Sequence, residues 1–182
     1  TIPDSITEIK DEAFGGCFGF NGLLKLPNSL KVVSKGLFKG CYGFSGTLNI
    51  PNSLTTIDEH AFEDCSGFSG SLILPNSVKY LSNEAFKNCY GFDKSLTLSN
   101  SITFISNGVF DGCSGFSGSL VLPNSMTSIG DNTFRGCSGF SGELTLSNSL
   151  SMIGKYAFDG CCGFKGSLNS SRKILDYWYF RV

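Results

Sequence analysis

The sequence predicts a β-rich repeat solenoid, in which short units stack into a coil with little or no α-helix. Three observations support this fold class: a fixed period of 24 residues, apolar groups too short for helices, and Gly, Ser, Asn and Pro between those groups. A 24-residue unit cannot enclose its own apolar side chains, so we expect the copies to stack in register and build one continuous core. The period is clearest in the cysteines, at Cys17, Cys41, Cys65, Cys89, Cys113, Cys137 and Cys161.

Phenylalanine and aliphatic residues supply the expected core. Phenylalanine occurs twice per unit, in one row from Phe14 to Phe158 and in a second row from Phe20 to Phe164. Residues 120–122 alternate as a half-buried strand does, and residues 126–129 are expected to form a second short extended segment. Glycines interrupt the unit after residue 136, so residues 133–137 can form at most one helical turn.

The repeats divide the chain into a solenoid and a tail. Residues 1–168 contain about seven units and start in the middle of a repeat, whereas residues 169–182 depart from the pattern. The apolar end of a solenoid needs a cover, so we expect this tail to be a C-terminal cap. The mid-repeat start suggests that the chain is a fragment of a longer protein or that chains associate end to end.

The repeated elements Leu-x-Leu-Pro-Asn-Ser, Ala-Phe and Cys-x-Gly-Phe recur together at fixed offsets. This pattern resembles the BspA-like leucine-rich repeats, which occur in surface proteins of Bacteroides and spirochaete relatives and of parasitic protists. The resemblance implies a right-handed leucine-rich-repeat coil and a role in adhesion to host cells or matrix proteins. The 24-residue unit of this chain is one residue longer than the shorter repeat of that family. The difference affects the expected curvature of the solenoid but not its fold class.

Composition and charge narrow the classes of partner. The 14 basic and 15 acidic residues give a net charge of −1 without blocks of like charge, which argues against nucleic acid. The sequence contains neither an apolar run long enough to cross a bilayer nor a signal peptide, so we expect no membrane insertion.

The cysteine row is expected to be a buried ladder of reduced thiols. In-register neighbours seldom have the geometry of a disulfide, and zinc needs ligands that converge on one point. The extra residue Cys162 occupies a position that is serine in other units, so we expect its thiol to face solvent.

The sequence predicts no catalytic site, no metal site and no cofactor. His60 is the only histidine, and its row also holds Gly36, Glu84 and Asn132, a variability that suggests a surface position. No acid, base or nucleophile is expected beside it.

A binding surface is expected where residues vary between units while the core rows stay fixed. The candidate binding face is the residue between the two strand leucines, which strand alternation turns outward: Lys25, Asn49, Ile73, Thr97, Val121 and Thr145. Two secondary rows carry aromatic residues, which are favoured interface anchors: Tyr80 and Phe104 in one row, and Phe18, Tyr42 and Tyr90 in the other.

These features favour a non-enzymatic interaction module, as part of a cell-surface or secreted adhesin that binds a protein or glycan ligand. Two alternatives remain. The unpaired cysteine row would suit an intracellular protein-interaction scaffold, because thiols persist in reducing compartments. The second alternative is a structural spacer, whose repeats would only hold another domain away from a surface. The fixed period is compatible with this role as well.

Overall fold

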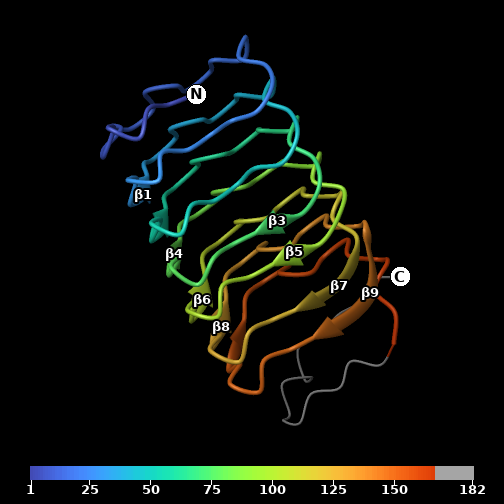
Figure 1. The fold of residues 1–182 in the computed structure, drawn as a ribbon. Coiled ribbons are helices and arrows are strands. Elements are labelled where there is room, and N and C mark those ends of the chain that lie inside the picture. The colour runs from blue at the N-terminus through green and yellow to red at the C-terminus, as the bar shows by residue number, and fades with distance from the viewer. Residues whose placement is uncertain (167–182) are drawn as a thin grey trace.

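The computed structural model describes residues 1–166, and they form a coil of stacked turns that rises from one end of the molecule to the other (Figure 1). The predicted fold class is confirmed: units of 24 residues are joined by short parallel strands, and residues 1–166 contain no α-helix. This described part therefore has no helix that could span a membrane. The proposed cap at residues 169–182 lies outside the described residues.

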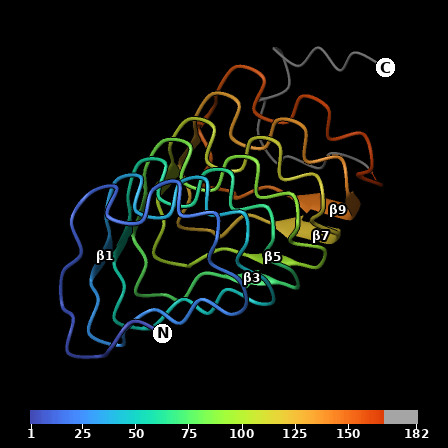
Figure 2. The same ribbon diagram turned by 90° about the horizontal axis from the view of Figure 1, so that it is seen from above.

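Each coil contributes up to two short strands, and equivalent strands of successive coils pair in parallel on two sides of the molecule (Figures 1 and 2). One side contains β1 (Val32–Val33), β2 (Thr56–Ile57), β4 (Tyr80–Leu81), β6 (Phe104–Ile105), β8 (Ser128–Ile129) and β10 (Met152–Ile153). The other contains β3 (Leu72–Ile73), β5 (Leu96–Thr97), β7 (Gly118–Val121) and β9 (Phe140–Thr145). Each partner lies 24 residues along the chain, as in the pair of Leu72 with Leu96, apart from a register shift between β7 and β9.

The core is a set of columns in which each side chain stacks on its own equivalents. Phe86, Phe110 and Phe134 are buried with nearly parallel rings, and their successive centroids are 5.7 and 5.4 Å apart. Phe116, from the second phenylalanine row, packs its edge against Phe110 at 6.1 Å. The two rows thus interlock, and every ring in the middle of the stack is covered by apolar atoms on both faces.

The turn that carries the first phenylalanine row has its own backbone ladder. The amide of Phe62 donates to the carbonyl of Ala85 in the next coil at 2.8 Å, and the amide of Phe86 donates to the carbonyl of Val109 at 2.9 Å. These bonds satisfy backbone groups that regular strands do not pair. The coils are therefore joined at this turn as well as along the two lines of strands.

The cysteines form the predicted ladder. Each buried thiol donates to a phenylalanine carbonyl of the preceding coil, for example Cys65 to Phe38 and Cys89 to Phe62, with Sγ–O distances of 3.0 Å. Every cysteine carries a free thiol, Cys162 is exposed, and Cys17 in the first coil is half-buried. Burial raises the pKa of the Cys41 thiol to about 11, because the thiolate would lose its hydration.

Replacing a stacked phenylalanine should destabilise the coil strongly. We expect Phe110→Ala to lower the free energy of unfolding by about 3–5 kcal/mol, because it leaves a cavity between two rings. The matched control, Phe104→Ala, removes a side chain that is 44% exposed, and should cost less than about 1 kcal/mol. Urea titration followed by circular dichroism would measure both. Equal losses would contradict the columnar core.

Thiol reactivity should separate Cys162 from the row. In the folded protein at pH 8, iodoacetamide should modify Cys162 first and half-buried Cys17 more slowly, whereas all eight cysteines should react in denaturant. A raised pKa keeps the Cys41 thiol protonated until the pH approaches about 11, so its reaction should remain slow below that pH. Mass spectrometry would count the modified residues, with Cys162→Ser as the control. Fewer than eight reactive thiols in denaturant without reductant would indicate disulfides.

Candidate functional site

The candidate binding face is a row of exposed side chains whose strand pairing is interrupted between β5 and β7. Lys25, Asn49, Ile73, Thr97, Val121 and Thr145 are all exposed. Buried Leu72 and Leu74 flank Ile73, so the alternation of the strand directs Ile73 outward. Parallel pairing sets Ile73 beside Thr97 and Val121 beside Thr145.

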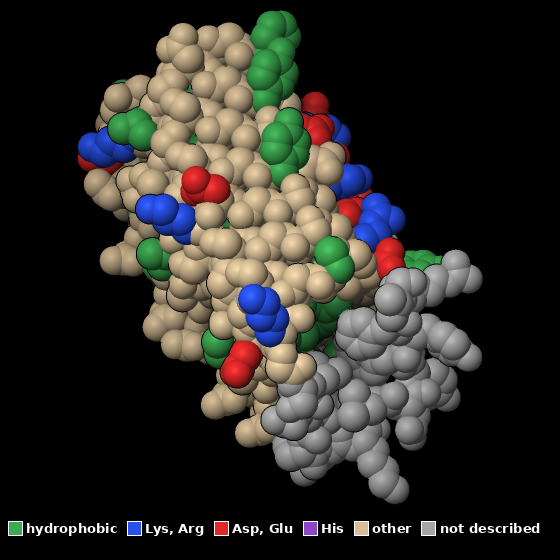
Figure 3. All heavy atoms as spheres, turned by 90° about the vertical axis from the view of Figure 1, so that its right-hand side faces the viewer, with side chains coloured by type: hydrophobic (Ala, Val, Ile, Leu, Met, Phe, Trp, Pro, Cys, Tyr) green, Lys and Arg blue, Asp and Glu red, His purple; other side chains and the backbone are tan. Residues whose placement is uncertain are grey.

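This face combines isolated apolar side chains with small polar ones. Ile73 and Val121 are 59% and 58% exposed and lie on either side of the Thr97 position. Figure 3 shows the side of the molecule on which β7 and β9 lie, where scattered charged and hydrophobic side chains stand among a larger area of backbone and other side chains. Such a surface suits a ligand recognised through hydrogen bonds and small apolar contacts.

The row of Tyr80 and Phe104 lies on the other line of strands. Both side chains are exposed, on β4 and β6, but the parallel ladder is interrupted between these strands. Val32 and Met152 are the other exposed apolar residues of this row, and Thr56 and Ser128 interrupt it. The structure therefore gives a discontinuous apolar stripe.

The third row is divided into two parts. The rings of Phe18 and Tyr42 stack with centroids 5.6 Å apart, and both are more than half exposed. Ser66 occupies the next position, so Tyr90 stands apart from this pair. The three candidate rows occupy separate lines along the solenoid, and their role in binding stays a prediction.

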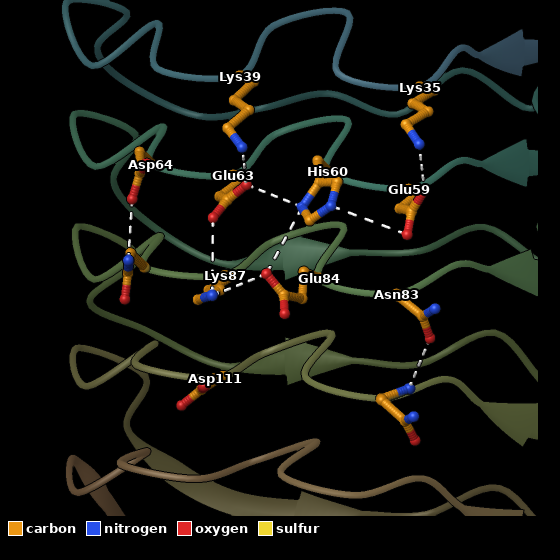
Figure 4. Close-up of polar contacts among 12 residues, drawn as sticks. Lys35, Lys39, Glu59, His60, Glu63, Asp64, Asn83, Glu84, Lys87 and Asp111 are labelled. Carbon is orange, nitrogen blue, oxygen red and sulfur yellow. Dashed lines mark hydrogen bonds and ion pairs between the residues drawn. The ribbon is translucent and has the colours of Figure 1, made fainter.

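A polar cluster that the sequence analysis missed surrounds His60 (Figure 4). His60 Nδ1 lies 2.8 Å from Oε2 of Glu63 and 3.5 Å from Oε2 of Glu84, which belongs to the next coil. Two lysines contact the same carboxylates: Lys39 lies 2.7 Å from Oε2 of Glu63, and Lys87 lies 2.7 Å from Oε2 of Glu84 and 3.7 Å from Oε1 of Glu63. The expectation that His60 has no carboxylate beside it is therefore wrong.

The backbone explains why the His60 row looked like an ordinary surface row. His60 and Glu84 both have φ of 56°, in the left-handed region, and the equivalent residues Gly36 and Gly108 have φ of 57° and 62°. Glycine and asparagine favour this conformation, so the variability of the row reflects a turn. His60 itself is half-buried, with its side chain 25% exposed.

The charges around this cluster are balanced locally. The hydrogen bond from Lys35 lowers the pKa of the Glu59 carboxyl, and the hydrogen bond to Glu84 raises the pKa of Lys87. Glu63 is buried although it is an acid. The side chains of His60 and Glu84 remain partly exposed, so the cluster is accessible from solvent.

One charged column runs through this site along six successive coils. It alternates in sign from coil to coil: Lys39, Glu63, Lys87, Asp111, Arg135 and Asp159. Arg135 forms a bidentate pair with Asp111 of the preceding coil, with N–O distances of 3.0 and 2.6 Å. Alternation prevents like charges from stacking. It could have been read from the sequence by comparing the charges of residues that lie 24 positions apart.

Comparisons with known proteins agree with this architecture. The chain is 27% identical to a leucine-rich repeat protein from T. pallidum, with a TM-score of 0.75, over 88% of this chain and 72% of that one. A leucine-rich repeat protein from Bacteroides ovatus is 20% identical, with a TM-score of 0.58, over 90% and 64%. The second likeness concerns the fold alone.

No curated protein sequence matches the chain. A family model described as the BspA type leucine rich repeat region matches residues 1–117 and 116–181 in six copies. Together these ranges cover almost the whole chain. The chain therefore belongs to the BspA-type leucine-rich-repeat family, whose members generally serve as protein-interaction modules.

Proposed function

We propose that this chain is a non-enzymatic interaction module that binds a protein or glycan ligand through the candidate binding face. One observation carries the proposal: the core rows keep the same residue type in successive coils, whereas the exposed residue between the strand leucines changes from Ile73 to Thr97 to Val121. A position that packing does not constrain can vary to suit a ligand.

We further propose that the module belongs to a cell-surface or secreted adhesin. Membership of the BspA-type family supports this proposal, because the resemblance implies adhesion to host cells or matrix proteins. The side seen in Figure 3 carries only scattered charged side chains, which suits a ligand that is not highly charged.

An intracellular scaffold is the second candidate function. The free thiol of Cys162 and the unpaired cysteine row favour it, because exposed thiols persist best in a reducing compartment. Burial weakens this argument for the row itself, because Cys89 and Cys113 are shielded from oxidants in either compartment.

Charged side chains in the middle of the candidate binding face should weaken adhesion. We expect Thr97→Lys with Val121→Lys to weaken binding to collagen- or laminin-coated surfaces and to cultured epithelial cells by at least about tenfold, because a lysine there must be desolvated on contact. Both positions are exposed, so folding should change by less than about 1 kcal/mol. Biolayer interferometry and cell-adhesion counts would measure the effect.

The matched control places the same charge on the other line of strands, as Tyr80→Lys with Phe104→Lys. Retained adhesion in this control would assign binding to the candidate face. The reverse result would move the site to the Tyr80 row, and absence of binding by the unaltered protein to every surface and cell type would overturn the adhesin proposal.

Compartment should distinguish the adhesin from the scaffold. An antibody against residues 1–166 should label intact cells that make the protein, since an adhesin must reach the outside to bind its ligand. Flow cytometry of intact and permeabilised cells would measure this, with a cytoplasmic protein as the control for leakage. Labelling that requires permeabilisation would favour the intracellular scaffold.

A further inference from the structure

We propose that His60, Glu63 and Glu84 form a binding site for one zinc ion. The site spans two adjacent coils, since His60 and Glu63 lie in one coil and Glu84 in the next. It is distinct from the candidate binding face and does not depend on the proposed function.

The three ligand atoms are arranged as neighbours around a common point. His60 Nδ1, one Glu63 oxygen and one Glu84 oxygen all lie within 4.8 Å of one another. Zinc binds imidazole nitrogen and carboxylate oxygen at about 2.0–2.2 Å, so tetrahedral ligands are separated by about 3.4 Å. The distances of 2.8 and 3.5 Å from Nδ1 to the two carboxylates bracket this value. Small side-chain rotations would therefore admit the ion.

One of the ligand atoms is buried without a suitable hydrogen bond. His60 Nδ1 and Glu63 Oε2 are both shielded from solvent and lie 2.8 Å apart. Lys39 holds Glu63 Oε2 at 2.7 Å, whereas His60 Nδ1 has no hydrogen-bond partner of acceptable geometry. Buried polar atoms normally find such partners. Nitrogen and oxygen atoms that approach closely without facing one another can both direct a lone pair to a third atom, as ligands of one ion do.

The other imidazole nitrogen also faces a carboxylate. His60 Nε2 lies 3.8 Å from Oε1 of Glu59, and Lys35 holds that carboxylate with a hydrogen bond of 2.6 Å. Histidine ligands commonly direct their second nitrogen to a carboxylate, which leaves the coordinating nitrogen unprotonated. At 3.8 Å the contact with Glu59 is electrostatic and not a hydrogen bond, so Glu59 favours this orientation of His60 without fixing it.

Lys39 and Lys87 compete with the ion for the two carboxylates. Lys39 contacts Oε2 of Glu63, and Lys87 contacts Oε2 of Glu84, each at 2.7 Å. Their side chains are 49% and 28% exposed, so both ammonium groups can move into solvent when zinc enters. The lysines balance the acidic charge of Glu63 and Glu84, and their removal should strengthen zinc binding.

The residue types favour zinc over the hard cations. Calcium and magnesium prefer oxygen ligands alone, whereas an imidazole with two carboxylates suits zinc and related transition metals. Three protein ligands leave one tetrahedral position for water. The partial exposure of His60 and Glu84 provides an entry path to that position.

Isothermal titration calorimetry with zinc chloride would test the site. We use the chain with Cys162→Ser, because the exposed thiol is itself a zinc ligand. One zinc ion should bind per chain, and His60→Gly or Glu84→Gly should weaken binding by at least about tenfold. Glycine is suited to these positions, because Gly36 and Gly108 hold the same left-handed conformation in neighbouring coils.

A variant in the same row provides the matched control. Asn132 has φ of 55° and lies outside the cluster, so Asn132→Gly should leave zinc affinity unchanged. Lys87→Gln should increase the affinity, because the ammonium no longer competes for Glu84 and Glu63. Circular dichroism would confirm that all variants are folded.

Absence of stoichiometric zinc binding would overturn the proposal, as would unchanged affinity in both His60→Gly and Glu84→Gly. Cobalt substitution gives a second readout that does not rely on affinity. The visible spectrum should lack the intense thiolate-to-cobalt band, and the appearance of that band would assign binding to the cysteines instead.

Discussion

The whole structure depends on the in-register stacking of 24-residue coils. A backbone amide in one coil bonds to a carbonyl in the next, as Phe62 does to Ala85, and the same offset recurs in the strands and in the Ala-Phe turn. A slip of one residue would exchange the inward and outward side chains of every strand in a coil. The length of the unit is thus fixed more strictly than the identity of most of its residues.

Stacking of equivalents has opposite consequences for apolar and charged residues. Phenylalanines gain when they stack on phenylalanines, and Cys65 and Cys89 can repeat the same bond to a carbonyl in each coil. Equal charges in a column would repel one another, so a charged column is favourable where the sign alternates, as from Asp111 to Arg135. Alternation also marks the correct register, since a shift by one coil would place like charges together. This charge pattern therefore contributes to the specificity of stacking, beyond the modest energy of each surface pair.

Most of the fold could be predicted from the sequence because stacking places each residue beside its own equivalents. Comparison along a row, for example of Leu72 with Leu96, is then a direct comparison of spatial neighbours. The His60 cluster escaped this comparison, because Glu63 comes from a different row than His60 and Glu84, and because the cluster spans two coils. The predicted strands were found, whereas the left-handed φ of His60 was read as surface variability. A test for glycine and asparagine within a variable row would have revealed the turn.

Each coil contacts only the coils directly before and after it, and this geometry limits the shape of a binding site that the solenoid can form. Equivalent rings repeat every 5.2 to 6.0 Å along the stack, so a row places only one equivalent side chain on each side of a given residue. A compact site must therefore draw its groups from one turn and its immediate neighbour, as His60, Glu63 and Glu84 do. A ligand of the candidate binding face contacts Ile73, Thr97 and Val121 in turn only if it extends along the stack. The proposed zinc site and the candidate binding face therefore use different parts of the repeat, because an ion needs groups that converge from two adjacent coils, whereas a macromolecular ligand needs a face that extends along many coils.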